Sequence, residues 1–202
     1  AAQAAIAIQN GLYAEKIERE ALTRERFQRL LSPAIAELVI SGEVEVKKGG
    51  ELRDTTVLFT DIRGFTRMSE SEAPQVIVDM LNEYFERMVE IVFRHQGTLD
   101  KFVGDEIMAL YGAPVHQADA AYSAVVTAVE MLDELERFNV DRAARGEERV
   151  DIGVGINTGE MIAGYLGSSR ALEYTVIGDA VNTGARLCAA AKAGQILISK
   201  IG

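Results

Sequence analysis

The chain has 202 residues, of which 48% are hydrophobic and 26% are charged, a balance typical of a globular protein with an ordinary core. Its 31 acidic and 21 basic residues give a formal charge of −10, which argues against a surface that coats nucleic acid. This charge is still compatible with a small nucleotide carried by metal ions. No run of about 20 apolar residues is present, so we expect no membrane span in this sequence.

The few cysteines and histidines exclude several kinds of site. A single cysteine, Cys188, rules out an internal disulfide and a thiolate metal cluster. It favours a reducing compartment, and we therefore expect a cytoplasmic protein. His95 and His116 are isolated in the sequence and cannot form a zinc site by themselves, so we expect structural roles for both.

Residues 1–43 are expected to form a helical extension to the main domain. Glu15/Arg19 and two later pairs place an acid one helical turn before a base, which suits an exposed helix. Apolar residues recur at sevens but Glu20 interrupts them, so a coiled coil and a plain linker both stay open. The first and last residues, "AAQAAIAIQN" and "QILISKIG", indicate a piece of a longer protein whose C-terminal end is cut short.

From residue 44 to residue 202 helices and strands alternate, and we expect one α+β domain. The expected elements are a strand over 55–61, a helix over 72–97, a hairpin over 98–111, a helix over 116–139, a strand over 150–159, a hairpin over 159–178, a helix over 179–193 and a strand over 195–199. The central order β-α-β-β-α-β is the ferredoxin-like arrangement, with helices expected on one face of a sheet. The helix over 72–97 should be amphipathic, with these residues on its apolar side: Val76, Met80, Tyr84, Met88 and Ile91.

Two carboxylates are expected to meet at one edge of this sheet. Asp61 ends the first strand, and Asp105 follows Gly104 at the tip of the next hairpin. Two such acids repel each other unless a cation lies between them, and Mg²⁺ prefers oxygen ligands of this kind. The backbone carbonyl of Ile62 is an additional candidate ligand. The alternative is that one aspartate caps a turn and the other fills one.

A later motif, "YTVIGDAVNTGARL", combines an amide and a guanidinium on one helix. Asp179 is expected to be the helix N-cap, and Asn182 and Arg186 are then one turn apart on the same face. An amide and a guanidinium side by side suit a ribose oxygen and a phosphoryl group that gains charge. The alternative is a capped helix that carries one surface arginine.

Four segments of the chain resemble the catalytic domain of the class III nucleotidyl cyclases over residues 50–202. They are "VLFTDIRGFT", "KFVGDEIMALYG", "VGINTGEMIAGYLG" and "YTVIGDAVNTGARL". The resemblance implies that Asp61 and Asp105, with the Ile62 carbonyl, bind two Mg²⁺ or Mn²⁺ ions. It also implies that Asn182 orients the ribose and Arg186 stabilises the transition state.

The resemblance further implies a head-to-tail homodimer and a pair of purine-binding residues. Lys101 and Thr175 match the purine pair, and the family's two sites lie at the interface, so that each subunit lends its metal aspartates to residues of its partner. A lysine ammonium only donates hydrogen bonds, and it can satisfy the unprotonated ring nitrogen of adenine but not the N–H of guanine. We therefore expect an adenylate cyclase that converts ATP to cyclic AMP. The Thr175 hydroxyl can both donate and accept, so it should discriminate less.

Two weaker resemblances concern regulation. Many cyclases have aspartate at the position of Thr175, and threonine is similar to the bicarbonate-responsive subgroup, so we expect stimulation by bicarbonate or CO₂. "AAIAIQNGLYAEKIERE" resembles the last helix of a GAF domain. Two alternatives are a diguanylate cyclase and a catalytically silent cyclase-like module. Diguanylate cyclases have GGDEF at the hairpin tip, where this chain has FVGDE, and they lack the VN…AR helix. A silent module usually lacks a metal aspartate or the arginine, and both are present here.

Overall fold

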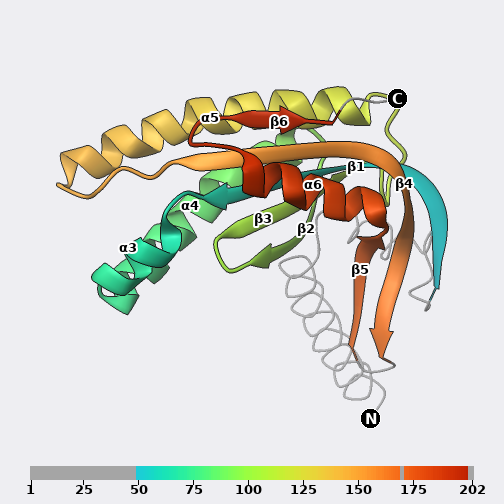
Figure 1. The fold of residues 1–202 in the computed structure, drawn as a ribbon, viewed down its shortest axis with the longest axis horizontal. Helices are drawn as coiled ribbons and strands as arrows, with labels where there is room; N and C mark the ends of the chain where they lie inside the picture. Colours follow the sequence, from blue (N-terminus) through green and yellow to red (C-terminus); the bar gives the residue numbers. More distant parts are fainter. Residues whose placement is uncertain (1–48, 169–170, 200–202) are drawn as a thin grey trace, which may run out of the picture. The chain divides into compact units, whose positions relative to one another are not determined.

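The computed structural model describes residues 49–168 and 171–199, which belong to one compact unit, Glu45–Gly202 (Figure 1). The expected N-terminal helix, its coiled-coil register and the GAF-like segment lie outside the described residues. The described elements are β1 (Gly49–Ile62), α3 (Phe65–Ser71), α4 (Pro74–Arg94), β2 (Thr98–Val103), β3 (Glu106–Tyr111), α5 (Ala120–Ala144), β4 (Ile152–Ser168), β5 (Ala171–Ile177), α6 (Asp179–Ala190) and β6 (Ile196–Ile198). None of these helices is long and apolar enough to cross a membrane.

The sheet confirms the expected ferredoxin-like core. Its strand order is β2-β3-β1-β4-β5, with each neighbouring pair antiparallel, and β6 adds to β4 in parallel. The central four strands therefore have the order that the β-α-β-β-α-β unit predicts. This order places the end of β1 next to the β2–β3 hairpin, because β3 lies between β1 and β2.

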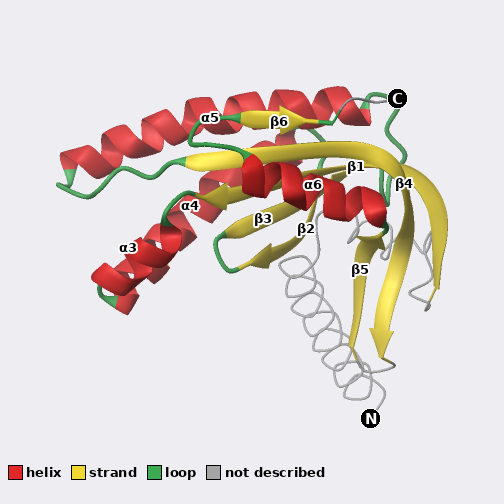
Figure 2. Ribbon diagram, viewed as in Figure 1, coloured by secondary structure: helices red, strands yellow, loops and turns green. Residues whose placement is uncertain are grey.

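Helices cover both faces of the sheet, and the expectation of helices on one face was wrong. Alternate residues of β1 point to opposite sides: Leu58 packs in the cluster formed with α4 and α5, whereas Val57 and Phe59 pack in the cluster that includes Cys188 of α6. Figure 2 shows α6 on one side of the sheet, away from α4. The β-α-β-β-α-β unit supplies α3, α4 and α5, and α6 follows the extra strand β5, which returns the chain to the other face.

The apolar side of α4 is shifted by one residue at its start. Met80, Tyr84, Met88 and Ile91 are buried as predicted, but Val76 is 45% exposed and Ile77 is buried instead. Ile77 keeps the three- and four-residue spacing of the others, whereas Val76 lies about 100° away around the helix.

β4 is one continuous strand of 17 residues, where the sequence had indicated a strand and a separate hairpin arm meeting near Gly159. Its pairing with β1 is uninterrupted from Gly49↔Tyr165 to Ile62↔Ile152. The strand bends instead of breaking, and Figure 1 shows β4 curving so that β5 is carried below the rest of the sheet. The bend matters for the site because it brings the edge strand β5 towards β2 at the opposite edge.

Candidate functional site

The structure brings Asp61 and Asp105 together. Asp61 is the second-last residue of β1, and Asp105 lies in the two-residue turn between β2 and β3, where Gly104 adopts φ = 65°. The backbone N–H of Ile62 donates a 3.0 Å hydrogen bond to Oδ2 of Asp105, which fixes the turn against the end of β1. The two carboxyl groups are close enough for the charge of Asp61 to raise the pKa of Asp105.

These carboxylates are short of positive charge. Burial, and then the charge of Asp61, raises the pKa of Asp105 to about 6. Burial also raises the pKa of the neighbouring Glu106, with Asp61 and Asp105 adding to the effect. The counter-charge is the guanidinium of Arg63, whose Nη2 lies 2.7 Å from Oδ2 of Asp61. Three acids against one arginine make this the place in the site where an added cation would be most favourable.

A metal here would need ligands from outside the side chains. No group of three or more His, Cys, Asp and Glu side chains within 49–168 and 171–199 is arranged to hold an ion. Two carboxylates with further positions left to backbone oxygen, water and substrate phosphate fit Mg²⁺ or Mn²⁺, which keep several such ligands. The donor set does not fit zinc, because the cluster contains no histidine and burial raises the pKa of the nearby Cys188 thiol to about 12, which keeps it from binding as a thiolate.

Lys101 and Thr175 come from opposite edge strands and meet through the bend of β4. Oγ1 of Thr175 on β5 donates a 2.8 Å hydrogen bond to Oδ2 of Asp100 on β2. Nζ of Lys101 lies 2.8 Å from Oε1 of Glu173 on β5 and 4.0 Å from Oδ1 of Asp100. The bulge in β2 between Leu99 and Lys101 leaves Asp100 without a partner on β3.

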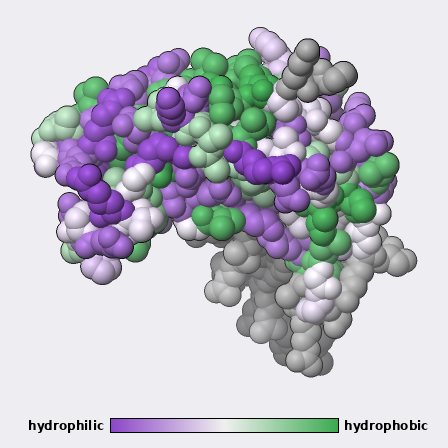
Figure 3. Space-filling model, viewed as in Figure 1, coloured by the Kyte–Doolittle hydropathy of each residue, from purple (hydrophilic) through white to green (hydrophobic). Residues whose placement is uncertain are grey.

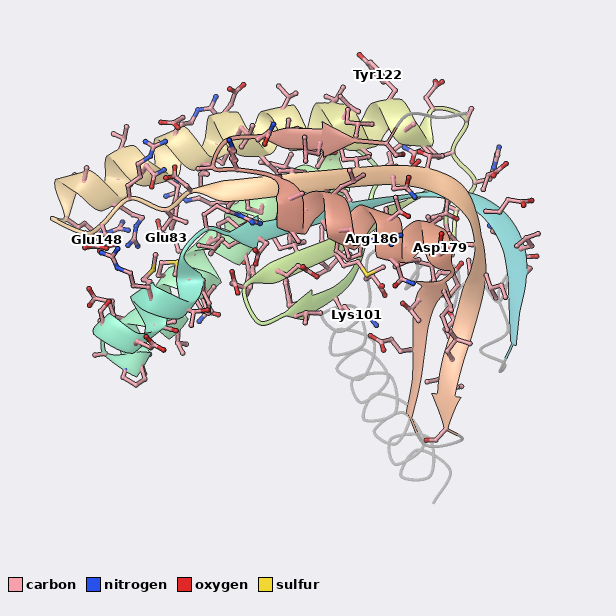
Figure 4. The ribbon with its side chains drawn as sticks, in the orientation of Figure 1. Glu83, Lys101, Tyr122, Glu148, Asp179 and Arg186 are labelled. Atoms are coloured by element: carbon pink, nitrogen blue, oxygen red, sulfur yellow. The ribbon has the colours of Figure 1, made fainter. Side chains whose placement is uncertain are left out.

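Asn182 and Arg186 lie on α6, one turn apart and exposed. Figure 4 shows Arg186 and Asp179 on α6 and Lys101 on β2. The side chain of Arg186 is 71% exposed, and its Nη2 donates a 3.1 Å hydrogen bond to Oγ1 of Thr183. The N-cap position belongs to Gly178, so the expectation that Asp179 caps the helix was wrong: Asp179 is the first helical residue, and its charge still favours the N-terminus.

The position of α6 is set by β4. Nδ2 of the buried Asn157 donates a 2.6 Å hydrogen bond to the carbonyl oxygen of Ala180 in the first turn of α6. Three glycines of β4 lie under the same helix and let it approach the strand closely: Gly153, Gly155 and Gly159. The "VGINTG" segment therefore packs directly against α6 and fixes the position of the helix that carries Asn182 and Arg186.

The site residues of this chain form separate groups. One is the carboxylate cluster, Asp61, Asp105 and Glu106 with Arg63. A second, named the purine cluster after the role that the sequence predicts for it, is Asp100, Lys101, Glu173 and Thr175. Asn182 and Arg186 on α6 are the third. Among the described residues, no hydrogen bond or ion pair joins the carboxylate cluster to the purine cluster.

The sequence reasoning missed Arg63 and Asp100. Arg63 follows the metal candidates directly, and its charge among three acids was the available signal. Asp100 is a carboxylate inside a strand beside Lys101, but the sequence pattern gives no signal for the bulge that buries its side chain.

The chain is similar to known nucleotide cyclases. Residues 47–201 match the family model described as the adenylate and guanylate cyclase catalytic domain. A relative called adenylate cyclase 1, from Rhizobium meliloti (strain 1021), is 38% identical over 135 residues, which are 67% of this chain and 20% of that protein. This chain spans about a fifth to a third of the length of the curated relatives it matches.

Two solved structures are similar over most of the chain. The guanylyl cyclase Cya2 superposes with a TM-score of 0.73 and 41% identity, covering 75% of this chain and 77% of that one. The adenylyl cyclase CyaB from P. aeruginosa gives a TM-score of 0.73 with 37% identity, covering 75% and 79%. The chain therefore belongs to the family of adenylate and guanylate cyclase catalytic domains.

Proposed function

We propose that this domain is an adenylate cyclase that converts ATP to 3′,5′-cyclic AMP and pyrophosphate with two divalent ions. The observation that carries the proposal is the meeting of Asp61 and Asp105 at the end of β1 with too little positive charge around them. The divalent ions that accompany a triphosphate would supply that charge.

Asp61, Asp105 and the backbone carbonyl of Ile62 are the residues that would hold Mg²⁺ or Mn²⁺. Bound there, the ions would lower the pKa of the ribose 3′-hydroxyl and neutralise the leaving pyrophosphate. The chain's part is to keep both carboxylates ionised and fixed, and the N–H of Ile62 serves this by holding Oδ2 of Asp105. Arg63 has to share Asp61 with the metal, because its guanidinium already pairs with that carboxylate.

The base would be bound by Lys101 and Thr175. One N–H of the ammonium faces Glu173 and another is directed towards Asp100, which leaves a third donor for the ring nitrogen on adenine's pairing edge. Guanine presents an N–H at that place, so two donors would face each other. Lys101 therefore favours ATP over GTP.

Asn182 and Arg186 would act on the ribose and on the reacting phosphorus. The amide of Asn182 holds a ribose oxygen so that the 3′-hydroxyl can attack the α-phosphorus in line, and pyrophosphate leaves from the opposite side. Arg186 donates to the phosphoryl oxygens as their charge rises. Its guanidinium is available for this role because it is 71% exposed and its two contacts are weak, a hydrogen bond to the neutral hydroxyl of Thr183 and a 3.7 Å ion pair with the exposed carboxylate of Asp179.

Two such chains would assemble head to tail into a homodimer with two shared sites. The purine cluster, Asn182 and Arg186 of one subunit would then face the carboxylate cluster of the other. Exposed apolar residues lie beside these groups, since Val103 at the β2–β3 hairpin is 56% exposed. Figure 3 shows further apolar surface over the part of the sheet where β4 and β5 turn away from the helices. A partner that covers Val103 would bury apolar area next to the site.

We also propose that bicarbonate stimulates the enzyme, and this proposal depends on the identity of residue 175 alone. This threonine takes the place of the aspartate that many cyclases have, and it is held by Asp100 within the purine cluster. A cytoplasmic location likewise remains a prediction from the single cysteine.

Product identity tests the proposal. Purified protein is incubated with Mn·ATP or Mn·GTP and the products are separated by chromatography and identified by mass, with Asp105→Asn as the metal variant. Asp79→Asn on α4 is the matched control, since Asp79 is exposed and bonds only Gln75 across one helical turn. Cyclic AMP from wild type and from Asp79→Asn, but not from Asp105→Asn, supports the proposal. No cyclic nucleotide from either substrate would indicate a silent cyclase-like module instead.

A further inference from the structure

Asp100 is the buried carboxylate of the purine cluster, and the proposed reaction gives it no direct contact with the substrate. Its side chain is 0% exposed, and Oδ1 accepts no hydrogen bond from any described residue. A buried carboxylate with one oxygen that accepts no hydrogen bond lowers the stability of the fold, and such a group calls for a functional explanation. The bulge in β2 gives the strand an additional residue at this point, Asp100, whose Oδ2 accepts the hydrogen bond from Thr175 on β5.

The hydrogen bond between Thr175 and Asp100 has a fixed direction. A carboxylate has no proton to give, so at 2.8 Å the hydroxyl of Thr175 must donate to Oδ2 of Asp100. A hydroxyl has only one proton. Once it is committed to Asp100, the Thr175 oxygen can offer only lone pairs to a ligand.

We propose that Asp100 is a positioning residue that makes Thr175 an obligate hydrogen-bond acceptor and thereby selects adenine. The 6-amino group of adenine donates and is matched by this oxygen, whereas the 6-oxo group of guanine only accepts and would face lone pairs. The inference rests on the proposed function, because it assigns Thr175 to the purine. It removes the ambiguity that a threonine hydroxyl has when it is taken alone.

Asp100 also faces the other member of the purine pair. Its free Oδ1 lies 4.0 Å from Nζ of Lys101, so one buried carboxylate holds the lysine by charge and the threonine by a hydrogen bond. Because its side chain has no exposed surface, Asp100 cannot touch the base itself. Its effect must pass through Thr175 and Lys101.

The experiment measures kcat/KM for Mn·ATP and Mn·GTP in wild type, Asp100→Asn, Thr175→Val and the double variant. An asparagine can turn its NH₂ towards Thr175 and free the hydroxyl to donate to guanine. We expect Asp100→Asn to lower the ATP:GTP ratio of kcat/KM by about tenfold, the worth of one hydrogen bond. In the Thr175→Val background the same change should alter the ratio by no more than about twofold, because only the smaller part of the effect that passes through Lys101 remains.

Glu173→Gln is the matched control. It makes the same carboxylate-to-amide change on a residue that contacts Lys101 but not Thr175. Any change it causes in the ratio should be the same in the threonine and valine backgrounds. The proposal is overturned if Asp100→Asn changes the ATP:GTP ratio equally in the threonine and valine backgrounds, or if it lowers kcat/KM for ATP and GTP by the same factor. Asp100 then only links the two strands.

A second measurement needs no variant. Burial raises the pKa of Asp100 to about 6, against the lowering effects of Thr175 and Lys101 and with Glu173 adding to the rise. Protonated Asp100 has a proton of its own to donate to Thr175, which frees the hydroxyl. The wild-type ATP:GTP ratio should therefore fall below about pH 6, while titration at Asp105 or on the triphosphate affects both substrates alike. A constant ratio from pH 8 to pH 5.5 would contradict the proposal.

Failure of the proposed function can be told apart from failure of this inference. If the wild type forms no cyclic product, the same variants are titrated calorimetrically with 3′-deoxy-ATP and 3′-deoxy-GTP in Mn²⁺, and the ratio of dissociation constants replaces that of kcat/KM. If the wild type prefers GTP, the adenylate assignment is wrong, but the dependence of the Asp100→Asn change on Thr175 is still measured.

Discussion

Adding a single methyl group at Gly155 should displace α6, the helix that carries Asn182 and Arg186, without touching either of these residues. A Cβ built there lies 2.2 Å from the backbone N of Cys188 and 2.5 Å from the carbonyl oxygen of Gly184, both on α6. Ordinary contact begins at 3.4 Å, so α6 must move by about 1.2 Å away from β4. Both atoms are backbone, and no flexible side chain can absorb the clash.

The displacement should lower both stability and activity. Overpacking of this kind costs about 3 kcal/mol, so we expect Gly155→Ala to lower the free energy of unfolding by that amount in urea titrations. A shift of about 1 Å in Asn182 and Arg186 should also cut kcat/KM roughly a hundredfold under conditions in which the variant is folded.

Gly159→Ala is the matched control on the same strand. Its Cβ would meet the methyl group of Ala180 at 3.1 Å, a smaller conflict that Ala180 can relieve. We expect its stability to lie within about 1 kcal/mol of wild type, because reduced backbone freedom of the unfolded chain offsets the contact. If Gly155→Ala and Gly159→Ala prove alike in stability and in activity, the close packing of α6 on β4 does not position Asn182 and Arg186.

Three further predictions concern specificity, regulation and pH. Lys101→Glu should lower kcat/KM for ATP by at least about tenfold and raise the relative use of GTP, because a carboxylate accepts where the ammonium donates; an unchanged preference in steady-state assays would contradict the base assignment. Cyclic AMP formation at fixed pH should rise with added bicarbonate, and a flat response with chloride as the salt control would refute the role given to Thr175. The metal-free protein should become more stable in urea as the pH falls from about 7 to about 5, because burial raises the pKa of Asp100 and Asp105 to about 6 and the native state then binds more protons than the unfolded chain. Asp100→Asn should flatten this slope, and a slope of opposite sign in the wild type would contradict the burial of these acids.

The parts of the fold that follow from local pattern were predictable. The hairpin with Gly104 and Asp105 at its tip follows from turn chemistry, and Met80, Tyr84 and Met88 follow from helical period. The length of β4 was not predictable, because Gly159 suggests a break and only the pairing with β1 along its length keeps the strand continuous.

The site divides in the same way. Adjacent strands bring Asp61 to Asp105 by topology alone, so their meeting could be inferred from the order of the elements. Asp100 and Thr175 lie on opposite edges of the sheet, and their contact depends on the bend of β4 and on a bulge. Bends and bulges arise from tertiary packing and leave little trace in a single sequence.

Complementation between two inactive variants tests most directly whether one site is shared by two chains. Asp105→Asn lacks a metal carboxylate and Arg186→Ala lacks the guanidinium, and each should form almost no cyclic AMP from Mn·ATP when alone. In an equal mixture half of the dimers are mixed, and each mixed dimer has one intact site and one doubly damaged site, so we expect about a quarter of wild-type activity. A mixture as inactive as its components, with subunit exchange shown by differential labelling, would contradict the shared site.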